Sequence, residues 1–537
     1  MTVETMRPLL YDQRTARKVT EVLHQTALTL WFLLLFCSSL AAQVSPLDLL
    51  IVNGIVFDGK SMRARRVDVG VRGDRIVYVG NIKRMQARRV IDARGLIVAP
   101  GFIDPHTHTL EDLSDPNRKS NVNYLMQGVT TVITGNDGGG PIEIERTLRR
   151  WEEGGIGTNA ALLVGHGTVR RQVMGMSDSA PTEDQLARMK ELIGRAMDEG
   201  AFGMSTGLYY APGSYARTEE VIELAKVVAA KGGIYDTHMR DEDSYSIGLL
   251  GSIRETLRIG REASIPVHIS HIKALGREVW GQSGAVIKLI HRARVEGIEV
   301  TADQYPYTAS GTSLIAALVP RWAEAGGRDQ LLARLADEPT RVRLLAEMER
   351  NLQRRGGPAS LLITSSRDPS LRGKTLAIIA AERHAKPVEA ALEIIRELGD
   401  VGVASFNMNE RDIENFMKQS WVVTGSDGST GHPRKYGTFP RKLREYVFRR
   451  RVISLPFAIR VSSALTAEIF RLPQRGRIAP GYFADLIVFD PQKVADRATY
   501  EQPELLAVGM RYVIVNGQLA VEDGRYTGAL AGRALRR

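Results

Sequence analysis

The chain has 537 residues, 43% of them hydrophobic and 6% aromatic, which is enough for one large globular domain and a smaller one. Its formal net charge is +11, but its arginine clusters, at 449–451 and at the C-terminal end, have no aromatic residues interleaved with them. This pattern favours a solvated basic surface over a nucleic-acid platform, so we expect no nucleic-acid partner and only a weak attraction for anionic substrates.

The N-terminal segment has the order of a secretory signal peptide. Basic residues between positions 14 and 18 precede an apolar run at 27–36, and small residues follow it up to Ala42. The run is shorter than the roughly 20 residues that cross a membrane comfortably. We therefore expect residues 1–42 to be a cleaved signal peptide, and the protein to be exported to the periplasm or out of the cell, with no stable membrane partner afterwards.

Other interpretations of this segment stay open. Cleavage after Ala41 or after Ala42 fits, the true start could be Met6, and the run could remain as an uncleaved anchor. The only cysteine, Cys37, lies inside the segment, so the mature chain would have no disulfide.

Short β-strand patterns stand at both ends of the remaining chain. Near the start, two such patterns flank the turn Arg72-Gly73-Asp74, and a similar pattern recurs at 484–490. We expect residues 46–98 and 476–530 to form two halves of one small β-sandwich domain. The alternative is two unrelated β segments.

Between them, residues 99–475 alternate strand and helix patterns. This alternation predicts an α/β fold, a (β/α)8 TIM-like barrel whose chemistry lies at the C-terminal ends of the strands. The stretch at about 316–402 is too long for a simple crossover and predicts a helical insertion before the last barrel strand. The expected strands are 96–103, 128–134, 160–164, 200–204, 233–237, 265–270, 297–302 and 421–425.

The expected strand ends carry metal-compatible side chains. His106 and His108 are two residues apart, so in an extended strand both point to one side and can reach one metal ion. Imidazole and carboxylate ligands without a thiol suit Zn²⁺, Mn²⁺, Co²⁺ or Fe²⁺, and such an ion would acidify a water and polarise a carbonyl. The later strand ends add Asp137, His166, His238, His271, Asp303 and Asp427.

The pattern Pro-Gly-Phe-Ile-Asp-Pro-His-Thr-His at 100–108, with single histidines on later strands and a final aspartate, resembles the amidohydrolase superfamily. It resembles most closely the D-aminoacylases, or N-acyl-D-amino-acid deacylases, and the likeness extends over almost all of the chain after the signal segment. The segments that carry it are 128–132, 205–208, 237–242, 269–273, 425–428, 432–434 and 437–441.

The resemblance implies roles for the site residues. His238 and His271 would hold the tighter metal, His106 and His108 a second, weaker one, and Asp427 would be the catalytic acid and base. The residues expected to grip the α-carboxylate of the substrate are Arg434, Tyr305 and Ser310, with Lys273 nearby. His166 either contacts the acyl amide or is held in a structural hydrogen bond.

One position departs from the family pattern. Family members usually carry a metal-binding cysteine in the Gly-Asn-x-Gly motif, where this chain has Asp137. A carboxylate can bridge two ions, so we expect one or two divalent metals, Zn²⁺ or a harder ion. A second interpretation is a single, weakly held metal with altered activity.

The resulting expectation is an enzyme, a metal-dependent hydrolase of N-acyl-D-amino acids that takes a small-molecule substrate. A related enzyme acting on a cyclic amide or on a dipeptide containing a D-amino acid is the alternative. A non-catalytic binding protein fits less well, because the histidines and Asp427 are all retained.

Overall fold

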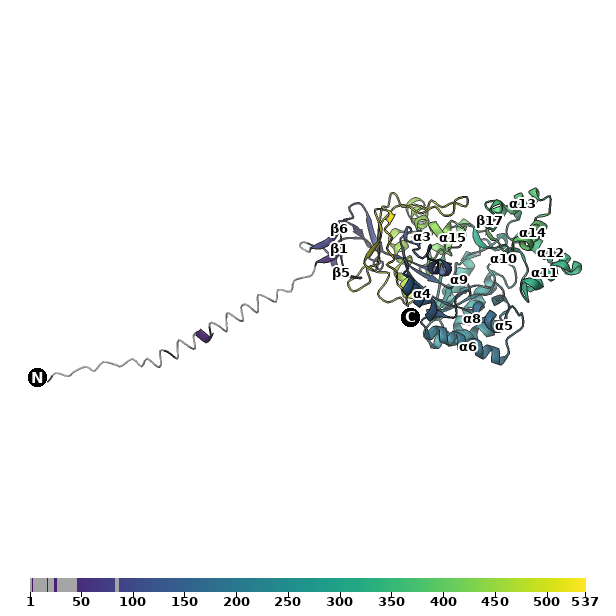
Figure 1. Ribbon diagram of the computed structural model, residues 1–537, viewed down its shortest axis with the longest axis horizontal. Helices are drawn as coiled ribbons and strands as arrows, with labels where there is room; N and C mark the ends of the chain where they lie inside the picture. Colours follow the sequence, from purple (N-terminus) through teal and green to yellow (C-terminus); the bar gives the residue numbers. More distant parts are fainter. Residues whose placement is uncertain (1, 3–16, 18–23, 27–45, 83–85) are drawn as a thin grey trace. The chain divides into compact units, whose positions relative to one another are not determined.

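The computed structural model describes residues 2, 17, 24–26, 46–82 and 86–537. The chain divides into two units, Met1–Leu47 and Asp48–Arg537, and the fold below is that of the second unit (Figure 1). The apolar run at 27–36 of the expected signal peptide lies outside the described residues. Among the helices that are described, none combines the length and the apolar character needed to cross a membrane.

In the described part of the chain, eight parallel strands form the expected barrel. One of the eight is interrupted at Leu163, and the two ends of the barrel meet where Thr107 bridges to Gly428 and the Asp427 N–H donates to the His106 carbonyl at 2.9 Å. The (β/α)8 prediction is confirmed. The strands, in sheet order, are β8 (Phe102–Thr107), β9 (Val129–Thr134), β10 (Asn159–Leu162) with β11 (Val164–Gly165), β12 (Gly203–Gly207), β13 (Ile234–His238), β14 (Val267–Ile269), β15 (Val300–Gln304) and β19 (Val422–Thr424).

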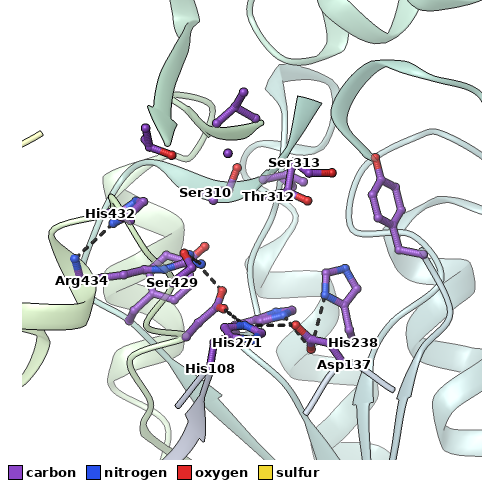
Figure 2. A pocket seen from close by; sticks show the side chains of 18 of the residues that line it. His108, Asp137, His238, His271, Ser310, Thr312, Ser313, Ser429, His432 and Arg434 are labelled. Atoms are coloured by element: carbon purple, nitrogen blue, oxygen red, sulfur yellow. Dashed lines mark hydrogen bonds and ion pairs between the residues drawn. The ribbon is translucent and has the colours of Figure 1, made fainter. Parts of the chain in front are cut away.

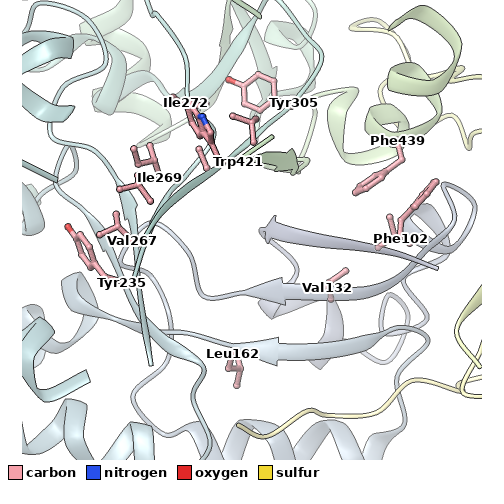
Figure 3. Packing of buried hydrophobic residues seen from close by; sticks show 14 of the residues in the cluster. Phe102, Val132, Leu162, Tyr235, Val267, Ile269, Ile272, Tyr305, Trp421 and Phe439 are labelled. Atoms are coloured by element: carbon pink, nitrogen blue, oxygen red, sulfur yellow. The ribbon is translucent and has the colours of Figure 1, made fainter. Parts of the chain in front are cut away.

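Helices cover the outside of the barrel, and the longer ones pack on it through an apolar face. In α6 (Glu183–Asp198), Met189, Leu192 and Ile193 are buried together, and a capping box between Thr182 and Gln185 satisfies its first N–H groups. Figure 3 shows the strand side of this core, including Val132 on β9. The other helices of the barrel domain are α2 (Leu110–Ser114), α3 (Val122–Leu125), α4 (Ile144–Gly154), α5 (His166–Met174), α7 (Thr218–Ala230), α8 (Gly248–Ala263), α9 (Ser283–Val295), α15 (Glu410–Met417), α16 (Arg434–Arg441), α17 (Leu455–Val461) and α18 (Ala464–Ile469).

The expected strand 96–103 is in fact two strands with different partners. Its first half, β7 (Ile97–Pro100), pairs with β20 (Leu486–Phe489), and its second half becomes β8. The break falls at Gly101, where an added Cβ would lie 2.2 Å from the Thr130 hydroxyl. A continuous apolar run therefore hid the boundary between two domains.

The small domain contains strands from both chain ends, as expected for the sandwich. β7 lies between β2, from the N-terminal side, and β20, from the C-terminal side. A second sheet packs on it through a shared apolar cluster that includes Val69, Val98 and Ile514. The first sheet is β23 (Arg525–Tyr526), β22 (Gln518–Glu522), β21 (Met510–Val515), β20, β7, β2 (Ile55–Val56) and β3 (Arg65–Arg66), and the second is β5 (Arg75–Gly80), β4 (Asp68–Arg72), β1 (Leu47–Val52) and β6 (Ala87–Asp92).

The insertion before β19 is helical, with an apolar core of its own. It also carries an antiparallel sheet that the sequence did not indicate, in which Ser310 is paired with Ser405. Its strands are β16 (Ser310–Ser313), β18 (Gly402–Ser405) and β17 (Leu361–Ser365), and its helices are α10 (Leu314–Leu318), α11 (Arg328–Ala336), α12 (Glu338–Arg354), α13 (Leu376–Glu382) and α14 (Pro387–Leu398).

Candidate active site

A cavity of about 360 Å³ lies between the C-terminal ends of the barrel strands and the sheet of the insertion (Figure 2). The barrel supplies the histidines and carboxylates, and β16 supplies Ser310, Thr312 and Ser313 on the facing wall. The cavity therefore lies where a TIM barrel places its chemistry, and the insertion closes it from the other side.

Two groups of possible metal ligands meet at one carboxylate. Asp137 belongs both to a group with His106, His108 and Asp427 and to a group with His238 and His271; within each group the ligand atoms lie within 4.8 Å of one another. Asp137 Oδ1 lies 3.5 Å from His106 Nε2, 3.7 Å from His238 Nδ1 and 3.6 Å from His271 Nε2.

Three of these four atoms are buried without a hydrogen-bond partner. His106 Nε2, Asp137 Oδ1 and His238 Nδ1 are buried and make no hydrogen bond. Burying a polar atom without a hydrogen-bond partner costs free energy. Here several such atoms face one another closely enough to share a metal ion. Nitrogen and oxygen donors arranged in this way fit divalent metal ions of the zinc type or harder ones.

Three of the possible metal ligands lie on residues with a left-handed backbone conformation, which sets the direction of their side chains. Asp137, His271 and Asp427 have φ values of +56°, +36° and +47°, although none is a glycine. Such conformations are strained and concentrate at functional sites. The strand register alone positions His106, whereas these three depend on the turns that follow β9, β14 and β19.

Carboxylates behind the histidines set their orientation. His271 Nδ1 lies 3.1 Å from Glu242 Oε1, which also accepts a 2.6 Å hydrogen bond from Lys273 Nζ, and His106 Nδ1 lies 3.7 Å from Asp303 Oδ2. His271 Nδ1 also lies 2.6 Å from Lys273 Nζ. With charged groups on the Nδ1 side of both rings, the Nε2 atoms face Asp137 and are free for a metal. Burial alone raises the pKa of Glu242, but Lys273 and the two nearby histidines hold that pKa well below its usual value.

Asp427 is shared between the histidines and an arginine. Its Oδ1 lies 3.0 Å from His108 Nε2, and its Oδ2 lies 2.9 Å from Arg434 Nη1. Burial alone raises the pKa of Asp427, but the charge of Arg434 and the neighbouring histidines lower that pKa well below its usual value. Asp427 is therefore a carboxylate near neutral pH.

The residues expected to hold an α-carboxylate do lie together. The Arg434 guanidinium stands 4.6 Å above the Tyr305 ring, and Arg434, Tyr305, Ser310 and Lys273 all line the cavity. The Nε and Nη1 atoms of Arg434 make no aligned hydrogen bond in spite of the close approach to Asp427. Arg434 thus forms an ion pair with Asp427 through Nη1 and keeps, at Nε, an N–H group that has no acceptor among the described residues.

The structure does not bring His166 to the cavity. Although it follows a barrel strand, the chain turns directly into α5, and the His166 side chain is fully buried with Nε2 3.0 Å from Glu220 Oε1. Glu220 also pairs with Arg170 at 3.2 Å. Of the two expected roles for His166, the geometry matches the structural hydrogen bond.

Several lining residues were not predicted. Tyr209 and Tyr210 follow β12, the one barrel strand at whose end no site residue was predicted, and their rings lie 5.7 and 4.7 Å from the His238 ring. The rule that barrel strands carry function at their C-terminal ends would have found them. Arg355, from the end of α12, also lines the cavity, and no local sequence pattern points to it.

Comparison with known proteins agrees with this geometry. The model of the amidohydrolase family matches residues 89–521. A D-aminoacylase from Alcaligenes xylosoxydans xylosoxydans is 36% identical over 519 residues, which cover 92% of this chain and 98% of that protein. A D-aminoacylase structure with a binuclear metal centre superposes with a TM-score of 0.78 at 36% identity, covering 92% of this chain and 100% of that one. The crystal structure of N-acyl-D-glutamate deacylase from Bordetella bronchiseptica, complexed with zinc and a phosphonate mimic of the tetrahedral intermediate, superposes with a TM-score of 0.79 at 32% identity, covering 92% and 100%.

Proposed function

This chain belongs to the amidohydrolase family, and from that premise we propose that it hydrolyses the amide bond of N-acyl-D-amino acids, giving a carboxylate and a free D-amino acid. One observation carries the proposal. One cavity is lined by the possible metal ligands, by the carboxylate of Asp427 and by Arg434, a side chain suited to bind a carboxylate. The relatives named above act on substrates of this class.

Asp137, His238 and His271 would hold one divalent metal, and His106 and His108 would hold a second with Asp137. A bound divalent ion acidifies a water and polarises the acyl carbonyl. Asp427 Oδ1, on the side facing His106 and His108, accepts the proton of the attacking water. It then returns this proton to the departing nitrogen, because an amine leaves poorly as an anion.

Arg434 orients the substrate. Its planar guanidinium matches the geometry of a carboxylate, and the Tyr305 ring beneath it fixes its plane. Ser310 stands on the same wall, with its hydroxyl donating to Asn407 Oδ1 at 3.0 Å. A substrate with a free α-carboxylate suits this wall better than an uncharged cyclic amide.

The direct test is hydrolysis of paired N-acetyl-D- and N-acetyl-L-amino acids by purified protein reconstituted with Zn²⁺, Co²⁺ or Mn²⁺. We expect release of free amino acid from the D members. A D-hydantoin and a dipeptide containing a D-amino acid should react more slowly. Faster hydrolysis of either of these two would replace the proposal with the corresponding alternative.

The metal assignment has its own test, in metal content rather than rate. His238→Ala and His271→Ala should lose most of the bound metal, because each removes a nitrogen from the group around Asp137. His166→Ala is a matched control, because His166 is equally buried but bonded to Glu220. Full metal content in both His238→Ala and His271→Ala would refute the assignment.

We also propose that the N-terminal segment directs export. The support is the order of basic, apolar and small residues before Ala42. N-terminal sequencing of exported protein should find a start near Gln43. A start before Ala27 would contradict cleavage and favour an anchor.

A further inference from the structure

Arg355 is a buried cation that forms no ion pair with any carboxylate of the described residues. It stands at the end of α12 with 2% of its surface exposed. Its Nη1 donates to Ser405 Oγ at 3.3 Å, its Nη2 donates to the Tyr209 hydroxyl at 3.1 Å, and its Nε makes no hydrogen bond. Both hydrogen-bond partners are neutral, and the guanidinium stands 5.8 Å from the centre of the Tyr245 ring.

Other deeply buried arginines of the described chain do have an acidic partner. Arg170 pairs with Glu220, Arg434 with Asp427 and Arg475 with Asp485. Within the described residues, no carboxylate lies within 4.0 Å of the Arg355 guanidinium nitrogens. An isolated buried charge is strongly unfavourable unless something else neutralises it.

The nearby Asp243 does not supply a full negative charge opposite Arg355. Both of its carboxylate oxygens lack a hydrogen-bond partner. Burial and the charge of Asp241 raise the pKa of Asp243 to about 7 and outweigh the charge of Arg355, which lowers that pKa. Asp243 is therefore only partly ionised near neutral pH. It also does not line the cavity, whereas Arg355 does.

The position of Arg355 relates it to the metal cluster. The Tyr209 hydroxyl accepts from Arg355, and the ring of the same tyrosine stacks on His238 with 5.7 Å between ring centroids. The hydroxyl of Tyr209 also donates to the Ala316 carbonyl at 2.7 Å, which fixes the tyrosine in place. Arg355 thus lies one tyrosine side chain beyond His238, whereas Arg434 lies beside Asp427.

We propose that Arg355 binds a second carboxylate of the substrate, so that the preferred substrates are N-acyl amino acids with two anionic groups. This inference rests on the proposed function. With the α-carboxylate on Arg434 and the amide at the metal cluster, the rest of the substrate extends toward Arg355. The second carboxylate is either at the end of the acyl group or on the amino-acid side chain. In both cases it meets the free Nε–H and the remaining terminal N–H groups of Arg355.

The test compares substrates of equal shape that differ in one charge. One pair is N-acetyl-D-glutamate and N-acetyl-D-glutamine, and the other is N-succinyl-D-leucine and its terminal amide. For the metal-loaded wild type we expect kcat/KM to favour the charged member by about 10²-fold or more in at least one pair, because a site built to bind a group rejects the analogue without it. The pair that shows the preference identifies the source of the carboxylate.

Variants then assign the preference to Arg355. Arg355→Gln should bring the ratio within the selective pair close to one, and Arg355→Lys should retain part of it. Arg354→Gln is the matched control, because Arg354 donates to Asn351 and Ser244 and does not line the cavity. It should leave the ratio unchanged.

The outcomes separate this inference from the proposed function. Hydrolysis of all four substrates without a preference for charge would overturn the role of Arg355 and leave the proposed function standing. A ratio that Arg355→Gln leaves intact, with both rates reduced equally, would mean a structural role only. No hydrolysis of these substrates or of N-acetyl-D-leucine would overturn the proposed function, and this inference with it.

Discussion

At the scale of single residues, Asp427 combines two roles that a substitution can separate. It belongs to a group of possible metal ligands, and it is also placed to carry a proton. Asp427→Asn keeps the shape and one oxygen donor but cannot shuttle the proton. We expect near-normal metal content and a kcat lower by at least about 10²-fold, the range that general acid–base catalysis supplies.

Metal analysis and steady-state kinetics on the same preparation measure both quantities. If metal and rate fall in parallel, Asp427 is a ligand rather than the proton carrier. Little change in kcat would remove it from the chemistry. Because Arg434 loses its ion partner in this variant, KM for carboxylate substrates should change as well.

Lys442 is a buried residue with a predicted effect on stability rather than on activity. Its Nζ donates to the Thr424 hydroxyl at 2.7 Å, and burial lowers the pKa of Lys442 to about 7. Between about pH 7 and the unfolded pKa near 10.5, the unfolded chain binds this proton and the folded chain does not. The free energy of unfolding therefore rises with pH between these two pKa values. Below about pH 7 the folded chain carries the buried charge of Lys442, and the full cost of burying that charge lowers its stability.

Lys442→Met should thus be more stable than the wild type at pH 6.5, and this difference in the free energy of unfolding should shrink as pH rises. The expected slope is up to about 1.4 kcal/mol per pH unit between pH 7 and 10. Urea denaturation of both proteins at several pH values measures it. A difference that is independent of pH would contradict the shifted pKa.

At the scale of elements, the turn after β9 positions Asp137, which belongs to both groups of possible metal ligands. Gly138 has a φ of +74°, and an added Cβ would lie 2.9 Å from the Gly207 backbone nitrogen. Gly139→Ala is a matched control, because its Cβ would meet only the Asn136 carbonyl at an ordinary 3.5 Å. We expect Gly138→Ala to weaken metal binding about tenfold or more and Gly139→Ala to have little effect, as measured by metal titration of the folded proteins. Equal effects would show that the turn does not set the position of Asp137.

The elements also explain which parts of the site the sequence could predict. Strand ends of a parallel barrel converge at one end, so His106, His238 and Asp427 could be brought together without knowing any side-chain conformation. His166 stands at such an end too, but the immediate start of α5 turns it toward Glu220.

The sheet of the insertion could not be predicted from the sequence for a different reason. Its three short strands come from separate parts of the chain, and β16 has the sequence Ser-Gly-Thr-Ser without apolar alternation. Pairing of this kind is non-local, so neither the sheet nor the place of Arg355 beside it follows from local patterns. The break between β7 and β8 was hidden for the opposite reason, because apolar residues continue across it.

At the scale of the whole molecule, a buried polar network joins the small domain to the barrel. Asp485, just before β20, forms an ion pair with Arg475 and accepts hydrogen bonds from the Asn516 backbone at 2.8 Å and from the Asn159 side chain at 3.2 Å. Asn159 belongs to barrel strand β10, and Asn516 follows β21. One carboxylate thus connects segments from three distant parts of the sequence.

Asp485→Ala should therefore destabilise the whole unit without acting on the site. It leaves the buried Arg475 charge unpaired and removes the acceptor for two further donors, so we expect a loss of about 3–5 kcal/mol in the free energy of unfolding. Glu468→Ala provides the control, because Glu468 pairs with Arg477 and Arg460 at a half-exposed position and should cost less than about 1 kcal/mol. Replacing both partners, as in Arg475→Met with Asp485→Leu, should cost less than Asp485→Ala alone, because no charge is then left buried. Urea denaturation gives the three free energies, and metal content and kcat of the folded proteins should match the wild type. A double variant as unstable as Asp485→Ala would show that the hydrogen bonds to Asn159 and Asn516, rather than the unpaired charge of Arg475, hold the two domains together.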